Sequence, residues 1–333
     1  MTKKNPKVKF ITLGCRVNQY ETQSMREALS REGFLTVSSA ASGNDDDHLR
    51  KAGGRKISEA DFVVINTCTV TGEADRESRY WIRRARREHP KARIVVTGCG
   101  VERDRPAIRI MSEVDRLVPN TEKPEIARHL LTDGEEPPCS EMSGTEEKKR
   151  GYPPLSISCS EGKTRAFIKI QDGCNHACSF CKVVLVRGGS RSRPPDDVLR
   201  EVERLRDAGY RDVVFTWIQL GAYGRDLSEK RLCALPRLLE TCSRIEGIER
   251  LRLSSIEPTD IEPDMISALR GIPKCMPHLH VPLQSGDDEI LRRMNRRYDS
   301  RFYSDLVERL RSEIPDFTLT LDVMAGLDRK SVV

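Results

Sequence analysis

Residues 171–181 read Gln-Asp-Gly-Cys-Asn-His-Ala-Cys-Ser-Phe-Cys, which places Cys174, Cys178 and Cys181 at a C-x3-C-x2-C spacing. The run before them, RAFIKI at 165–170, predicts a β-strand, so the cysteines open a loop at the carboxyl end of a strand. Three thiolates this close in sequence can hold three irons of a four-iron, four-sulfur cluster. Because no fourth cysteine follows at a ferredoxin spacing, one iron would keep an open coordination position for chemistry. A structural zinc site is the alternative, but such sites usually take four ligands from two separated pairs.

The composition suits a folded protein of about two domains. The chain has 333 residues, and domains average roughly 150. Recurring Val, Ile and Leu runs argue against disorder, although 32% of the residues are charged. The eleven cysteines follow no hydrophobic signal segment, which favours metal ligation in a reducing cytoplasm over disulfides. No apolar stretch approaches about 18 residues, so we expect no membrane association. The net charge of +6 favours polyanionic partners only weakly.

The first 132 residues predict an N-terminal domain built on a doubly wound parallel sheet. Short apolar runs alternate with helical patterns, which is the order that a parallel α/β sheet requires. The glycine-rich segment 38–58 predicts an exposed insertion, and the Glu- and Pro-rich segment 133–152 predicts a linker between domains. We expect strands at 8–13, 60–65 and 93–97, and helices at 20–31 and 73–88.

A second group of three cysteines is distributed over this N-terminal domain. Cys15, Cys68 and Cys99 each come directly after a predicted strand. Since the carboxyl ends of parallel strands share one edge, where ligands bind, the three thiols should meet there. The pattern favours a second three-thiolate site, and the alternative is three buried structural cysteines.

The predicted helix at 73–88 is strongly basic. A face of arginines can contact phosphates, but an arginine run is more often simply a solvated face, and we favour the solvated face from sequence alone. The arginines are Arg76, Arg79, Arg83, Arg84, Arg86 and Arg87.

Residues 153–333 predict a partial α/β barrel. Five strand-and-helix units alternate here, and a closed eight-fold barrel would need more chain. The carboxyl ends of barrel strands form the active-site face, and several polar residues fall at such ends. His280 taken alone could be a packed core histidine, but its place on a barrel strand favours the active-site mouth. The polar residues are Thr216, Ser254, Ser255, Glu257, His280, Gln284 and Asp322.

Four motifs together make the chain resemble the radical S-adenosylmethionine superfamily and, within it, the methylthiotransferase family. They are TLGCRVNQYET at 12–22, INTCTVT at 65–71, VTGC at 96–99 and KIQDGCN at 169–175. The first two are most similar to the branch that modifies N6-threonylcarbamoyladenosine in tRNA. The resemblance covers nearly the whole chain apart from 38–58 and 133–152, and it implies a barrel of the radical S-adenosylmethionine type at 153–333.

The resemblance implies two [4Fe-4S] clusters and S-adenosyl-L-methionine as cofactors. Cys174, Cys178 and Cys181 would hold the radical-generating cluster, whose open iron chelates S-adenosylmethionine, and Phe180 would flank the adenine. Cys15, Cys68 and Cys99 would hold the auxiliary cluster that carries the sulfur. One S-adenosylmethionine would supply the methyl group and a second the radical that takes hydrogen from C2 of the adenine, since the cofactor brings the hard chemistry. Ser255, Glu257, His280 and Gln284 match positions that line the S-adenosylmethionine pocket.

The implied partners are tRNA modified at position 37, on the 3′ side of the anticodon, a reducing protein such as a flavodoxin or ferredoxin, and a sulfur source. Arg187 and Arg193 match a basic segment where a tRNA phosphate would lie. Alternatives are a methylthiotransferase for isopentenyladenosine in tRNA or for a ribosomal protein, and a non-catalytic iron–sulfur remnant.

Three departures from the family pattern stand out. Val184 lies where the family has a proline, and Trp217 replaces a glycine, so its indole is expected to crowd the cofactor pocket. The chain ends at Val333, which predicts a C-terminally truncated barrel without the family's C-terminal RNA-binding β-domain. That loss is expected to weaken tRNA binding and to open the active site to water.

Overall fold

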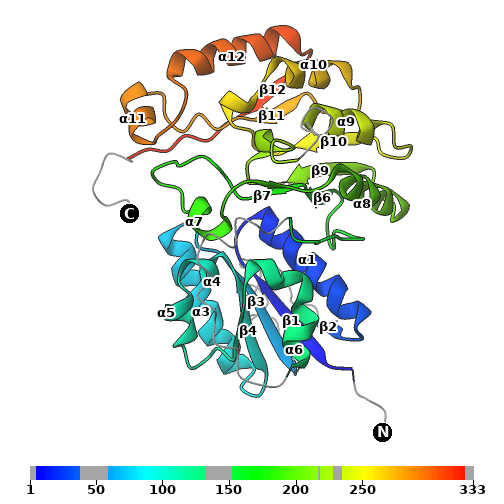
Figure 1. The fold of residues 1–333 in the computed structure, drawn as a ribbon, viewed down its shortest axis with the longest axis vertical. Coiled ribbons are helices and arrows are strands. Elements are labelled where there is room, and N and C mark those ends of the chain that lie inside the picture. The colour runs from blue at the N-terminus through cyan, green and yellow to red at the C-terminus, as the bar shows by residue number, and fades with distance from the viewer. Residues whose placement is uncertain (1–4, 38–58, 133–151, 217, 228–234, 327–333) are drawn as a thin grey trace, which may run out of the picture. The chain divides into compact units, whose positions relative to one another are not determined.

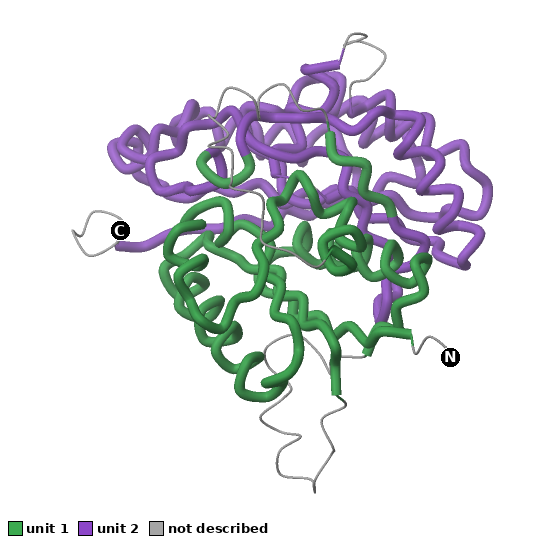
Figure 2. Tube along the Cα trace, turned by 60° about the horizontal axis from the view of Figure 1, so that its bottom comes forward, with its two compact units in different colours: residues 1–156, 185–187 green, residues 157–184, 188–333 purple. Residues whose placement is uncertain are grey.

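The computed structural model describes residues 5–37, 59–132, 152–216, 218–227 and 235–326. The predicted insertion at 38–58, nearly all of the predicted linker and Trp217 lie outside the described residues. The chain divides into two compact units (Figure 2). The N-terminal unit comprises residues 1–156 with 185–187, and the C-terminal unit comprises residues 157–184 with 188–333.

The N-terminal unit is built on a five-stranded sheet in which every pair of neighbouring strands is parallel (Figure 1). The strand order is β2-β1-β3-β4-β5, which confirms the predicted doubly wound sheet. The chain starts in the middle of the sheet, extends to one edge and then crosses to the other. The strands are β1 (Lys7–Thr12), β2 (Leu35–Val37), β3 (Phe62–Thr67), β4 (Arg93–Gly98) and β5 (Arg116–Val118).

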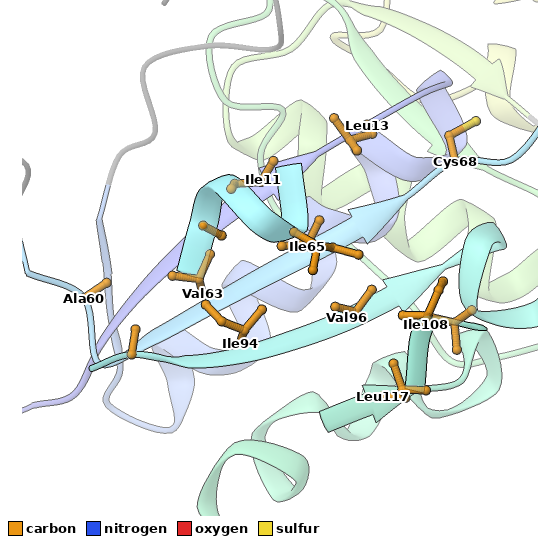
Figure 3. Packing of buried hydrophobic residues seen from close by; sticks show 14 residues of the cluster. Ile11, Leu13, Ala60, Val63, Ile65, Cys68, Ile94, Val96, Ile108 and Leu117 are labelled. Atoms are coloured by element: carbon orange, nitrogen blue, oxygen red, sulfur yellow. The ribbon is translucent and has the colours of Figure 1, made fainter. Parts of the chain in front are cut away.

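Both faces of this sheet are covered, because apolar residues occur on both sides of the central strands. Val64 and Val95 pack on one face against the first and last helices of the unit. Ile65 and Val96 pack on the other face against the basic helix and two short helices (Figure 3). The first face carries α1 (Arg16–Arg31), η1 (Asn120–Glu125) and α6 (Ile126–Leu131), and the second carries α3 (Gly72–Glu88), α4 (Cys99–Arg103) and α5 (Arg105–Arg109).

In the described part of the C-terminal unit, five barrel strands follow one another in chain order. Strands β6, β9 and β10 form one parallel sheet, and β11 pairs with β12 in parallel. Isolated parallel bridges from Leu251 to Cys275 and from Ser255 to His280 connect β10 with the β11 segment. The partial barrel predicted from sequence is confirmed. The strands are β6 (Ala166–Lys169), β9 (Asp212–Thr216), β10 (Arg250–Leu253), β11 (His278–His280) and β12 (Thr318–Thr320).

Helices cover this sheet in the same sequential order, with α8 against α9, α9 against α10, and α10 against α12. The described residues contain no helix long and apolar enough to cross a membrane. The main helices are α8 (Pro195–Asp207), α9 (Leu235–Ser243), α10 (Pro263–Gly271), α11 (Asp288–Arg293) and α12 (Ser300–Glu313). Smaller elements are the antiparallel pair β7 (Gln171–Asp172) and β8 (Arg191–Ser192), helix α7 (Val183–Arg187), η3 (Leu220–Ala222) and η4 (Pro258–Asp260).

Candidate functional site

The loop that carries Cys174, Cys178 and Cys181 begins at a glycine that no other residue could replace without strain. Gly173 has a φ of 74°, in the left-handed region that favours glycine. A Cβ atom there would lie 2.0 Å from the carbonyl oxygen of Gly189. The next amide, that of Cys174, donates to the carbonyl of Gly188 at 3.1 Å. Backbone atoms on the two sides of the loop are therefore in direct contact, and this contact fixes the position of the Cys174 backbone.

The buried side chain of Gln171 ties this loop to the segment that follows β9. Its amide nitrogen donates to the carbonyls of Asp172 and Gly173 at 2.9 and 2.7 Å. Its amide oxygen accepts from the backbone nitrogens of Ile218 and Gln219 at 3.1 and 2.8 Å. The side chain of Gln219 in turn accepts from the amide of Asn175 at 3.1 Å. Sequence gave no sign of this role, because it depends on contacts about 47 residues apart along the chain.

Cys178 and Cys181 lie close enough to Cys174 to affect its ionisation. Burial, together with the neighbouring Cys178, Cys181 and Glu257, raises the pKa of Cys174 to about 11. Burial also raises the pKa of Cys178, while Arg296 opposes that shift. Metal binding must displace these protons, because the thiolate is the ligand. The backbone nitrogen of His176 donates to the sulfur of Cys174 at 3.3 Å and so favours its anionic form.

A second segment, residues 293–296, holds the cysteine loop from the outside. The Ser179 amide donates to the carbonyl of Met294 at 3.1 Å, and Asn295 donates to the carbonyl of Ala177 at 2.8 Å. The guanidinium of Arg296 lies 5.5 Å from the centre of the Phe180 ring. This arrangement places Phe180 beside a cation rather than in a purely apolar setting.

Arg296 also binds both carboxylate oxygens of Glu257, at 2.6 and 2.7 Å. It therefore joins two of the predicted cofactor-binding residues, Phe180 and Glu257. Arg296 is not predictable from sequence, where it lies in a short basic run at 292–297 that matches no motif.

The remaining predicted cofactor residues lie at the carboxyl ends of β10 and β11. Ser255 pairs with His280 across the two strands. The His280 ring lies 3.0 Å from the Thr320 hydroxyl and 3.2 Å from an Asp322 carboxylate oxygen. Gln284 has a φ of 66°, and its amide donates to the carbonyl of Asp322 at 2.8 Å. The structure thus brings His280 together with Asp322, another residue predicted to lie at a strand end.

In the N-terminal unit, two glycines bring Cys15, Cys68 and Cys99 to one edge of the sheet. Gly14 has a φ of 89°, and a Cβ there would lie 2.6 Å from the Cys68 sulfur. Gly98 has a φ of 102°, and a Cβ there would lie 2.4 Å from the backbone oxygen of Thr67 in β3. Figure 3 shows Cys68 beyond the carboxyl end of β3, at one end of the apolar cluster.

These three cysteines differ in exposure. Cys15 is exposed at the start of α1, whereas Cys68 and Cys99 are buried. Burial raises the pKa of both buried thiols, and the Cys15 sulfur contributes to each shift.

The donor sets suit clusters better than single metal ions. Within the described ranges, no three His, Cys, Asp or Glu side chains converge closely enough to hold one metal ion. In a four-iron cluster each thiolate binds its own iron, so the sulfurs need not converge on a point. Among the described residues, each trio offers three thiols, which is the donor set expected for a four-iron cluster with one open iron.

A buried charge network lies beneath the N-terminal cysteines. Arg187 donates to Glu21 at 2.7 Å and to the side-chain oxygen of Asn18 at 2.8 Å. Glu21 also binds the fully buried Lys123, which donates to Asn66 at 3.1 Å. Two cations share one carboxylate here, and both cations favour the ionised form of Cys99, although burial still raises its pKa.

This network corrects one prediction. Arg187 and Arg193 were expected to face a tRNA phosphate, but only 5% and 4% of their surfaces are exposed. Arg187 binds Glu21, and Arg193 binds Glu201 at 2.8 Å. A buried arginine paired with a carboxylate satisfies its donors inside the protein, so neither residue is available to RNA in this structure.

Two family models match the chain. The radical SAM superfamily model matches residues 168–333, and the model of uncharacterized protein family UPF0004 matches residues 47–119. Proteins of the radical SAM superfamily use a [4Fe-4S] cluster and S-adenosylmethionine.

Curated relatives cover almost the whole chain. The threonylcarbamoyladenosine tRNA methylthiotransferases MtaB of Bacillus subtilis and Chlamydia pneumoniae are 36% and 37% identical over 320 and 323 residues. These alignments cover 96% and 97% of this chain and 66% and 68% of the relatives. The tRNA-2-methylthio-N(6)-dimethylallyladenosine synthase of Acidothermus cellulolyticus is 32% identical over 328 residues, covering 95% of this chain and 60% of that protein. The chain thus spans between 60% and 68% of the length of these relatives.

Solved structures show the same fold. The radical S-adenosylmethionine methyltransferase TsrM of Kitasatospora setae superposes with a TM-score of 0.64 at 18% identity, covering 96% of this chain and 69% of that one. The cobalamin-dependent enzyme OxsB gives a TM-score of 0.59 at 12% identity, covering 98% of this chain and 51% of the other. At these identities the likeness concerns the fold alone.

Proposed function

Because the chain belongs to the MtaB-like methylthiotransferase family of the radical SAM superfamily, we propose that it attaches a methylthio group to C2 of N6-threonylcarbamoyladenosine at position 37 of tRNA. The observation that supports the proposal is that each unit contains a group of three free cysteines, Cys15, Cys68 and Cys99 in one and Cys174, Cys178 and Cys181 in the other. One site suits radical generation and the other suits delivery of sulfur, and methylthiolation of a C–H bond requires both. A reducing protein and a sulfur source complete the requirements.

In this proposal each site has its own set of residues. Cys174, Cys178 and Cys181 hold the [4Fe-4S] cluster that binds S-adenosylmethionine, and Cys15, Cys68 and Cys99 hold a second cluster. The bound cofactors supply the radical that takes hydrogen from the adenine and the methyl group of the product. Phe180, Ser255, Glu257, His280 and Gln284 bind S-adenosylmethionine. Arg296 fixes the Glu257 carboxylate in place before any ligand arrives.

The chain reconstituted with iron and sulfide under anaerobic conditions tests this proposal directly. Reductant, S-adenosylmethionine and tRNA carrying threonylcarbamoyladenosine are added, and nucleosides and small products are analysed by mass spectrometry. The methylthio nucleoside is the expected product. If 5′-deoxyadenosine forms without any methylthio nucleoside on any tRNA tested, the proposed substrate is wrong.

Two matched variants separate the sites. Cys174→Ala should abolish 5′-deoxyadenosine formation, whereas Cys99→Ala should preserve it and abolish only the methylthio product. Equal loss of 5′-deoxyadenosine in both variants would contradict the division of labour.

A second candidate substrate is the dimethylallyl-modified adenosine of tRNA. The Acidothermus relative, at 32% identity, is named as a synthase for that product. Parallel reactions with the two tRNAs decide between the candidates by the ratio of their kcat/KM values.

A further inference from the structure

The six arginines of α3 divide into two groups that the sequence does not distinguish. Arg84 and Arg86 are part of the fold. Arg84 pairs with Glu88 at 2.7 Å and lies 4.6 Å from the centre of the Trp81 ring. Arg86 pairs with Asp115 at 2.5 Å and donates to backbone carbonyls of neighbouring loops. These two guanidiniums already have their partners.

The other four arginines are exposed and line one hollow of about 400 Å³ together with the half-exposed ring of Tyr80. Their spacing of three and four residues puts them on a single face of the helix, over a length of about 16 Å at 1.5 Å per residue. We call this face the α3 stripe, and it consists of Arg76, Arg79, Tyr80, Arg83 and Arg87.

The stripe has almost no internal charge compensation. In the part of the chain that the structure describes, Arg79, Arg83 and Arg87 form no ion pair, and Arg76 pairs with Glu73 at 3.4 Å where both side chains are 77% exposed. Such an exposed pair is worth little. Arg79 and Arg83, and Arg83 and Arg87, are like charges four residues apart, and each such pair destabilises the helix. An ordinary solvated face would alternate charges at these positions.

We propose that the α3 stripe is a docking surface for the sugar–phosphate backbone of tRNA. The inference rests on the proposed function, which makes tRNA the substrate. Guanidinium groups bind phosphate oxygens in a bidentate manner, and a row of them follows a polyphosphate chain better than a compact acidic patch. The exposed ring of Tyr80 adds a face on which an unpaired base can stack. Phosphate contacts position an RNA without reading its sequence, so the stripe would set the orientation of the substrate.

The salt dependence of tRNA affinity gives a quantitative test of the α3 stripe. The variant Arg79→Gln/Arg83→Gln/Arg87→Gln removes three positive charges. Because log K falls against log salt by about 0.7 to 0.9 per neutralised phosphate, the slope should become shallower by about 2 to 3. Affinity in about 0.1 M salt should fall at least tenfold, equally for tRNA with and without threonylcarbamoyladenosine. Fluorescence anisotropy with labelled tRNA and the reconstituted chain measures both quantities.

The matched control removes three exposed arginines from a single helix of the C-terminal unit, α12. It should keep the wild-type slope to within about 0.5, although its net charge is the same as that of the stripe variant. Iron content and 5′-deoxyadenosine formation without tRNA should be unchanged in both, since neither set touches a cysteine site. The control residues are Arg301, Arg309 and Arg311.

Each outcome decides between interpretations. Equal slopes for wild type, stripe variant and control overturn the inference. A stripe variant that keeps the wild-type slope but is reduced more slowly by an acidic flavodoxin assigns the face to a protein partner instead, which also overturns it. If the stripe variant shows the shallower salt slope but the wild-type chain forms no methylthio nucleoside, the docking surface is supported and the proposed reaction is wrong. A wild-type chain with no affinity for tRNA overturns both.

Discussion

Arg187 offers the sharpest test of how the N-terminal unit is held together. It donates to Glu21 at 2.7 and 3.3 Å and to Asn18 at 2.8 Å, and about 2% of the Arg187 and Glu21 side chains is exposed. Breaking a buried pair by removing one partner costs about 3–5 kcal/mol. In Arg187→Met the carboxylate of Glu21 still binds Lys123, so we expect the lower end of this range, about 3 kcal/mol.

Hydrogen–deuterium exchange of α1 peptides in the full chain measures this loss where it occurs. Glu21 and Asn18 both lie on α1, so the helix should open more often when the arginine is removed. A loss of about 3 kcal/mol corresponds to exchange about 100-fold faster, since each 1.4 kcal/mol is a factor of ten.

Arg193→Met is the matched control. It breaks an equally buried arginine–carboxylate pair, with Glu201 of α8 in the C-terminal unit. It should accelerate exchange in α8 and leave α1 unchanged. An increase of less than about threefold in α1 for Arg187→Met, or an equal increase in α1 for both variants, would refute the reasoning. Loss of tRNA binding by Arg187→Met without any change in exchange would instead favour the phosphate-contacting role expected from sequence.

Three further changes probe the loop at 173–181. Gly173→Ala should lower the iron content of the reconstituted chain toward that of the N-terminal site alone, because the new methyl group would collide with the backbone of Gly189. Iron analysis measures this loss. The control Gly162→Ala, at a similar φ of 69° but with nothing within 4 Å of the added Cβ, should keep the wild-type iron content. In the metal-free chain, the rate of Cys174 alkylation, followed by mass spectrometry, should keep rising up to about pH 11, because only the thiolate reacts and the pKa of Cys174 is raised. At pH 8 Cys174 should contain about 100-fold less thiolate than an ordinary thiol with a pKa of 9.0. A rate that stops rising near pH 9 would contradict this. Arg296→Gln should weaken S-adenosylmethionine binding by about 10- to 100-fold in calorimetry, because Glu257 loses a charged hydrogen-bond partner worth roughly 1.5–3 kcal/mol. Unchanged affinity would exclude that orienting role.

The sequence predicts the central strands well because their residues are apolar on both faces. Val63 through Ile65 and Ile94 through Val96 are buried on alternate sides, which is typical of the middle of a parallel sheet. The edge strands were missed. β2 has only three residues, none of them buried, and β5 contains Arg116, whose buried charge is satisfied by backbone carbonyls far along the chain.

The candidate sites were likewise predicted only in part from the sequence. The positions of the six cysteines relative to the strands follow from sequence, and their role as ligands stays a prediction. Arg296 and Lys123 were missed because their partners, Glu257 and Glu21, lie 39 and 102 residues away. The prediction that Arg187 contacts a tRNA phosphate was wrong because a basic run in the sequence shows the charge of a side chain but not whether that side chain is buried.

Helix α7 lies across the boundary between the two compact units. Its residues 183–184 belong to the C-terminal unit and its residues 185–187 to the N-terminal unit, so the chain passes from one unit to the other three times, after 156, 184 and 187. A fragment that ended before residue 185 would keep Glu21 and Lys123 but lose Arg187, the second cation bound to that carboxylate. The N-terminal unit is therefore not encoded by one continuous stretch of sequence, and a cut anywhere between residues 156 and 185 leaves it incomplete.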